Sequence, residues 1–128
     1  MILKDILSDQ FGKSFHTLRS SKELKASIAW KLLPTSKRLK EHFEEYDKLR
    51  LDLCKKFATK GEDGEPLLIE NQFTFPPEVA NDFNKELQAL HAVEIDLPEP
   101  KVKISDLKSV KLSVEDLEVL AGPVLIEA

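Results

Sequence analysis

Residues 22–58 read KELKASIAWKLLPTSKRLKEHFEEYDKLRLDLCKKFA, and this stretch decides the fold class. Its apolar side chains recur at steps of three, four or seven residues: Leu24, Ile28, Leu32, Leu39, Phe43, Tyr46, Leu49, Leu53 and Phe57. This spacing places them along one side of an α-helix. The sequence therefore predicts a long helical region from about Lys22 to Ala58, about 50 Å long if it is straight.

Two features modify this helix. Pro34 lies inside it, and a proline removes one backbone hydrogen bond and crowds the carbonyl group four residues earlier. We therefore expect the region either to kink near Leu33 or to split there, with Pro34 opening a second helix. Upstream, Ser20 and Glu23 have the spacing of a capping box, which makes Ser20 the expected N-cap.

The segment before the long helix also has a helical pattern. Apolar residues from Leu3 to Leu18 recur at steps of three or four. Gly12 lies among them and costs about 1 kcal/mol relative to alanine in a helix. One helix or two short pieces are therefore both consistent with this stretch.

The second half of the chain mixes both periodicities. Phe73–Phe75 alternates like a short strand, and Pro76-Pro77 precedes a helical stripe that reaches about His91. Val93–Leu97 and Lys101–Ile104 both alternate, which predicts a β-hairpin. Ser113 and Asp116 form a capping box before a last short helix, and Val124–Ile126 is a candidate edge strand.

These elements predict an α+β fold: a long kinked or split helix plus shorter helices packed on a small antiparallel sheet. The 128 residues suit a single domain, 1–128, with a helical half at 1–60 and a mixed helix and strand half at 61–128.

Composition restricts the class of protein. The 19 basic and 23 acidic residues give a formal net charge of −4, which argues against a protein that binds nucleic acid through bulk charge. The single cysteine, Cys54, predicts a reducing, intracellular location. We expect no secretion signal at the N-terminus and no membrane span, since no long apolar run occurs.

Signatures of catalysis and metal binding are missing from the sequence. His16, His42 and His91 fall in different predicted elements without metal-ligand spacing, so we expect them to be exposed and uncommitted. Cys54 is expected to be a small apolar residue beside the helical stripe. No G-x-S-x-G, P-loop or G-x-G-x-x-G pattern occurs. We therefore predict that the protein is not an enzyme, with no catalytic, cofactor-binding or metal-binding residues and no cofactor.

The long helix is the candidate interaction surface. Basic residues on it and just after it include Lys31, Lys37, Arg38, Lys40, Arg50, Lys55, Lys56 and Lys60. The four residues that we expect to contact a partner or an anion are Trp30, Arg38, Tyr46 and Arg50. Carboxylates interleave with the basic residues and dilute their field, so a protein partner or a second copy of the chain is preferred over a nucleotide or nucleic acid.

An ordered series of segments resembles small accessory proteins of tailed bacteriophages and prophages. The segments are ASIAWKLL at 26–33, YDKLRLDL at 46–53, EDGEP at 62–66, FNKEL at 83–87, VEID at 93–96 and KISDL at 103–107. That group has a long charged helix, an acidic turn with glycine, a second helix and a short β-tail. The chain departs from it at Pro34 and at residues 73–77.

The resemblance implies an origin in a phage and a location in the host bacterial cytoplasm or the virion. The expected function is that of a non-enzymatic accessory protein, either a minor virion component or an assembly factor, that acts through protein–protein contacts. One alternative is an anti-defence protein that inhibits a host immune enzyme or sequesters a nucleotide messenger. Another is a regulator that binds nucleic acid through the Lys/Arg stripe.

Overall fold

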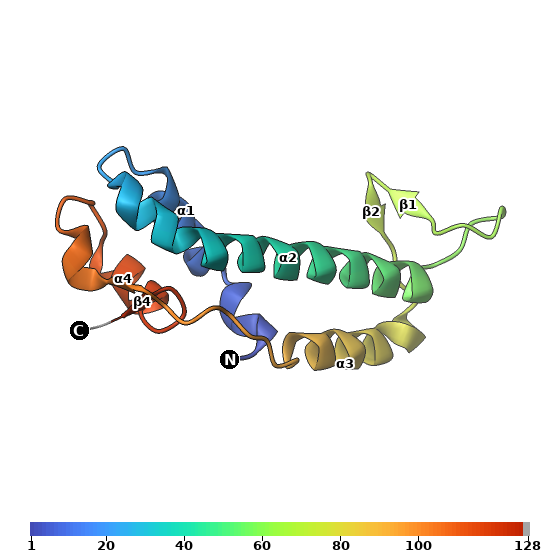
Figure 1. Cartoon of the computed structure of the whole chain (residues 1–128). Coiled ribbons are helices and arrows are strands. Elements are labelled where there is room, and N and C mark those ends of the chain that lie inside the picture. The colour runs from blue at the N-terminus through green and yellow to red at the C-terminus, as the bar shows by residue number, and fades with distance from the viewer. Residues whose placement is uncertain (127–128) are drawn as a thin grey trace. The chain divides into compact units, whose positions relative to one another are not determined.

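The computed structural model describes residues 1–126 (Figure 1). In chain order its elements are η1 (Leu3–Ile6), α1 (Asp9–Ser20), α2 (Ala26–Phe57), β1 (Leu68–Ile69), β2 (Gln72–Phe73), η2 (Pro77–Val79), α3 (Ala80–His91), β3 (Val102–Lys103), η3 (Ile104–Leu107), α4 (Val114–Leu120) and β4 (Leu125–Ile126), where η denotes a 3-10 helix. The predicted α+β class is confirmed: one long helix and shorter helices accompany a small antiparallel sheet.

The long helix α2 is a single element that runs through Pro34 without splitting. It begins a few residues later than predicted, where the amides of Ile28 and Ala29 donate to the carbonyl oxygen of Lys25 at 3.0 and 2.9 Å. The prediction that Ser20 caps it is wrong. Ser20 is the last residue of α1, and its hydroxyl bonds back to the carbonyl oxygen of His16.

The first predicted helix breaks before Gly12, not at it. The chain forms η1, leaves helical geometry near Leu7, and starts α1 after Ser8. The Ser8 hydroxyl accepts a hydrogen bond from the Phe11 amide, 3.1 Å away, and so caps α1. Gly12 lies inside α1 in open space, so its only cost is conformational.

Two separate two-stranded sheets replace the predicted one. β1 and β2 are antiparallel and joined at Glu70 and Asn71, which both have positive φ, as a two-residue type I′ turn requires. β3 pairs in parallel with β4, so the candidate strand at Val124–Ile126 is formed at Leu125–Ile126.

The predicted hairpin of Val93–Leu97 with Lys101–Ile104 is wrong. Glu94 instead makes an isolated antiparallel bridge with Ile2, and Val102–Lys103 pairs with the C-terminal strand. Pro98 and Pro100 sit in the connection, where a tight hairpin turn would not accommodate them.

The chain divides into two compact units. Unit 1 comprises residues 1–41 and 94–128, and unit 2 comprises residues 42–93. The expected single domain stays a prediction, and Glu127 and Ala128 at its end lie outside the described residues.

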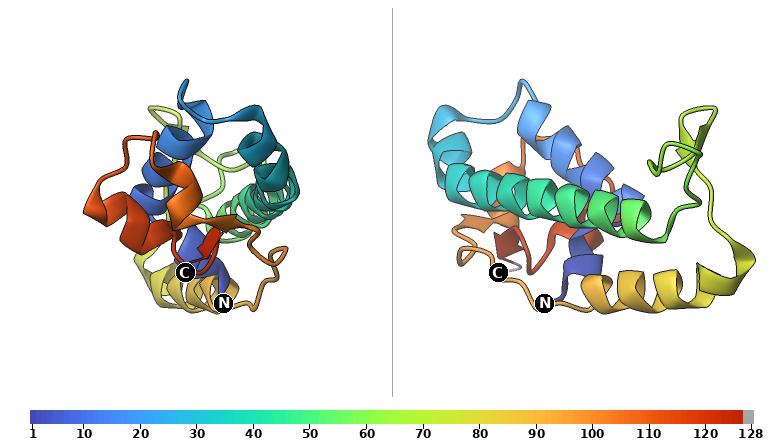
Figure 2. Two further views of the ribbon diagram at one scale, coloured as in Figure 1. Left: turned by 60° about the vertical axis from the view of Figure 1, so that its left-hand side comes forward. Right: turned by 90° about the vertical axis from the view of Figure 1, so that its right-hand side faces the viewer.

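Unit 1 holds nearly all of the apolar core. Within residues 1–126 it contributes 14 of the 16 buried hydrophobic residues, among them Phe11, Leu18, Leu39, Val102 and Leu125. Within it α1 packs on α4, and the two helices are seen together in Figure 2. The predicted capping box of α4 is confirmed, with the Asp116 amide bonded to the Ser113 hydroxyl and the Ser113 amide bonded to the Asp116 carboxylate.

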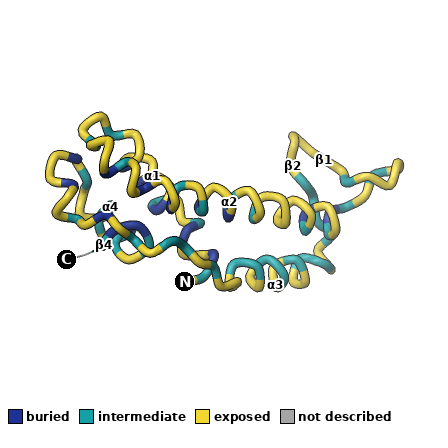
Figure 3. Tube along the Cα trace, in the orientation of Figure 1, coloured by how far each residue is buried: buried dark blue, intermediate teal, exposed yellow. Residues whose placement is uncertain are grey.

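Unit 2 is built differently. Its buried residues are His42, Cys54 and Ala58, and none of the twelve residues of α3 is buried (Figure 3). Cys54, which we expected to be a small apolar residue beside the helical stripe, is buried and forms no disulfide. Unit 2 is therefore held by contacts along partly exposed faces of its helices.

Candidate functional site

The four residues predicted to contact a partner fall into two pairs. Trp30 and Arg38 belong to unit 1, and Tyr46 and Arg50 belong to unit 2. All four lie on α2.

Trp30 is the most exposed large apolar residue of the described chain, with 74% of its surface open to solvent, and Leu33 next to it on the helix is 42% exposed.

Arg38 lies two turns further along α2 and forms salt bridges with two carboxylates. Its two terminal nitrogens contact Glu41 and Asp96, each at 2.8 Å. Hydrogen bonds to Asp96 first and Glu41 second raise the pKa of Arg38 above its ordinary value, so its charge is permanent and already paired.

Tyr46 forms a specific contact in unit 2. Its hydroxyl lies 2.9 Å from Nε2 of His91, at the C-terminal end of α3. Burial raises the pKa of Tyr46, and the nearby positive charge of Arg50 opposes that rise. Arg50 itself is exposed.

The histidines differ from expectation. His42 is buried and interacts with other residues, and His91 is partly buried against Tyr46. His16 is exposed, as predicted. Helical spacing placed His42 correctly on α2, but it could not show that this side of the helix is covered there.

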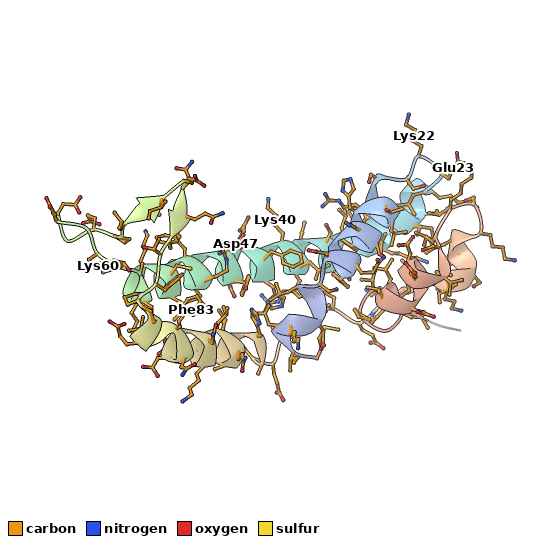
Figure 4. All side chains as sticks on the ribbon, turned by 180° about the vertical axis from the view of Figure 1, so that it is seen from behind. Lys22, Glu23, Lys40, Asp47, Lys60 and Phe83 are labelled. Carbon is orange, nitrogen blue, oxygen red and sulfur yellow. The ribbon has the colours of Figure 1, made fainter. Side chains whose placement is uncertain are left out.

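Contacts between α2 and α3 define an antiparallel helix pair within unit 2. Tyr46 meets His91 at one end, and Phe57 meets Phe83 at the other, with ring centroids 6.0 Å apart. Phe83, labelled in Figure 4, also packs against Phe75 at 4.6 Å, so it ties the segment after β2 to both helices. A groove lies along the two helices between these ends.

The groove has a volume of about 450 Å³ and is mostly apolar. We call it the α2/α3 groove; it is lined by Leu49, Asp52, Leu53 and Lys56 from α2 and by Glu86, Ala89 and Leu90 from α3. Lys56 crosses it to Glu86, with Nζ 3.2 Å from Oε1. Leu49 remains 48% exposed, because nothing in the described chain fills the groove.

Sequence reasoning missed this groove. Leu49, Leu53 and Lys56 have the i, i+4, i+7 spacing of one helix face, and Glu86 and Leu90 have the i, i+4 spacing on α3. These spacings were visible in the sequence. Which two faces meet depends on the pairing of α2 with α3, which spacing alone does not specify.

A second exposed apolar surface of unit 2 is the β1–β2 hairpin. Leu67, Leu68 and Ile69 are 40%, 52% and 57% exposed. The Thr59 carbonyl and amide bond to the Leu67 amide and the Thr74 carbonyl, which fixes the base of the hairpin. Three acidic residues precede it along the chain and one lies in its turn: Glu62, Asp63, Glu65 and Glu70.

Unit 1 has two hollows of its own, each lined mainly by polar side chains. One, of about 390 Å³, is lined by Lys25, Ser27, Ile28, Ser105, Asp106, Lys108 and Ser109. The other, of about 460 Å³, is lined by His16, Thr17, Ser20, Ser21, Lys22, Glu23 and Lys111. Neither contains Arg38, the unit 1 arginine that the sequence proposed for anion contact.

No three His, Cys, Asp or Glu side chains within residues 1–126 come together as a metal site would need. In the same range, none of the helices combines the length and the apolar character needed to cross a membrane. Comparisons of the chain with known protein families, with curated proteins and with solved structures give no match.

Proposed function

We propose that this chain is a non-enzymatic accessory protein that acts through protein–protein contacts, with the α2/α3 groove as its docking surface. The resemblance to accessory proteins of tailed phages favours a minor virion component or an assembly factor of such a phage. The observation that carries the proposal is the open groove in unit 2, whose mostly apolar walls include Leu49, Leu53 and Leu90, in a unit with few buried residues.

The apolar faces of α2 and α3 in unit 2 are only partly buried. Two antiparallel helices alone cannot enclose their apolar faces, and helical proteins normally bury such faces against further helices. Covering a half-exposed leucine is worth about 1 kcal/mol, so a partner that covers several gains a useful fraction of its binding energy there. The Lys56–Glu86 pair at the rim suits recognition, because it is accessible and costs little to rearrange.

The two alternative functions stay predictions. A phosphate ligand of Arg38 would have to displace both Glu41 and Asp96, and the structure gives no observation that favours this exchange. Protein contact is therefore the function that we carry forward.

A capture experiment tests the proposal. The tagged full-length chain is expressed in cells in which its phage replicates, and bound material is quantified against the chain. We expect a protein, either a partner or a second copy, in fixed proportion to the wild-type chain, and a loss of most of it with Leu49→Ser. Leu51→Ser is the matched control, since Leu51 is a comparably exposed leucine of α2 that does not line the groove.

Recovery of only nucleotide or nucleic acid would contradict the proposal. Equal recovery of the same protein with both variants would show that the groove is not the surface used.

A further inference from the structure

We infer that the α2/α3 groove receives an amphipathic helix of a different protein, with basic residues beside its apolar stripe. The inference rests on the proposed function and names the chemistry of the partner. Three observations carry it: the shape of the groove walls, the charge of unit 2, and the carboxylate of Asp52 on the apolar wall.

The walls have the geometry of a helix receptor. On α2 the first and last lining residues, Leu49 and Lys56, are seven residues apart with Leu53 between them, which is about two helical turns. On α3 the lining residues Glu86 and Leu90 have the same helical spacing, and the two helices run antiparallel. A groove between two such helices accepts a third helix, with apolar anchors at i, i+3 or i+4 and i+7.

Charge selects the kind of helix. Unit 2 contains eleven Asp and Glu residues against six Lys and Arg residues, a formal net charge of −5, whereas unit 1 carries thirteen basic and twelve acidic residues, a net charge of +1. Two copies that met through their unit 2 surfaces would bring two charges of −5 together, and this disfavours a second copy as the occupant of the groove. A basic helix gains from the same field.

Asp52 is the residue with which a basic side chain of the partner helix would pair. Its side chain lines the groove, and it has no salt-bridge partner among residues 1–126, while Glu86 on the opposite wall is paired with Lys56. A docked helix would cover the Asp52 carboxylate, and leaving it unpaired there would cost binding energy. A Lys or Arg next to the apolar stripe of the partner satisfies it.

The test uses the full-length chain and two synthetic probe peptides. Each peptide is an amphipathic helix of about four turns with the same leucine stripe, flanked by lysines in one and by glutamates in the other. Binding is measured by fluorescence anisotropy at low and at moderate salt. We expect the lysine peptide to bind and the glutamate peptide not to bind, with the affinity falling as salt is added.

Two pairs of variants locate the site. Leu49→Ser should weaken binding of the lysine peptide by about fivefold, and Leu51→Ser should leave it unchanged. Asp52→Lys should weaken it by about fivefold at low salt, and Asp47→Lys should have much less effect although it changes the net charge equally. Asp47 is on the side of α2 turned away from α3 (Figure 4). Asp52 and Asp47 are both exposed, so these substitutions keep the test valid if Leu49→Ser fails to fold.

Equal binding of both peptides, or equal effects of Asp52→Lys and Asp47→Lys, would overturn the inference. A chain that binds neither peptide but forms a dimer lost with Leu49→Ser would also overturn it, while the proposed protein–protein function would stand. If the chain binds neither peptide, stays monomeric and captures no protein in cells, both fail.

Discussion

At the scale of single residues, the bond between Ser14 and Asp116 links α1 to the start of α4. The buried Ser14 hydroxyl donates to Oδ1 of Asp116 at 2.6 Å, and the other carboxylate oxygen accepts from the Ser113 amide at 3.0 Å. These bonds, the Ser14 bond first, lower the pKa of Asp116 below its ordinary value. One carboxylate therefore serves both as part of the helix cap and as a contact between two helices of the unit 1 core.

Replacing this carboxylate should destabilise unit 1. Asp116→Asn is expected to lower the free energy of unfolding by about 1 kcal/mol at neutral pH, measured by urea denaturation. Because the folded-state pKa is depressed, the contribution of the carboxylate is present above the unfolded pKa and is lost as the pH falls below about 4. The difference between wild type and variant should therefore shrink in acid. A difference that stays constant with pH would contradict this account.

The absorbance of Tyr46 reports on its contact in unit 2 without interference from other tyrosines, because it is the only tyrosine in the chain. Its burial against His91 raises its pKa above 10.0, so the tyrosinate absorbance of the folded protein should rise at a higher pH than that of the unfolded chain. With a raised pKa, the stability due to the neutral phenol is present below pH 10 and is lost as the pH rises through the folded-state pKa. An unshifted titration would show that this contact does not persist in solution.

At the scale of elements, Pro34 interrupts the backbone hydrogen bonding of α2. It is exposed, and its lack of an N–H leaves the carbonyl of Trp30 without its helical donor. Pro34→Ala should therefore raise the free energy of unfolding by about 1 kcal/mol or more, measured by urea denaturation with helix content followed by circular dichroism. Destabilisation would show that α2 needs the geometry that proline imposes.

The elements also show what sequence can and cannot specify. The C-terminal end of α2, the helix after Pro77 and the cap at Ser113 follow from spacings within a few residues, and all three were predicted. The pairing of Val102 with Leu125 was not, because alternation identifies a strand and says nothing about its partner. The groove was missed for the same reason, since it exists only once α3 lies against α2.

At the scale of the whole molecule, the two units differ in how well they are buried. All the buried residues of α1 contribute to the unit 1 core, whereas α3 has none. Amide hydrogen exchange should therefore be faster throughout α3 than in the middle of α1, measured by mass spectrometry on the full-length chain. Equal protection of the two helices would contradict the description of α2 and α3 in unit 2 as a helix pair whose apolar faces are only partly buried.

The central claim is that a protein covers the α2/α3 groove in cells. The most direct test places a photo-crosslinking benzoylphenylalanine at Ala89, which lines the groove, or at the neighbouring exposed Gln88, which does not. After illumination of bacterial cells of the proposed phage host that produce the chain, we predict a discrete protein adduct, identified by mass spectrometry as a different protein, from position 89 and none from position 88. No protein adduct at position 89, or the same adducts at both positions, would contradict the account.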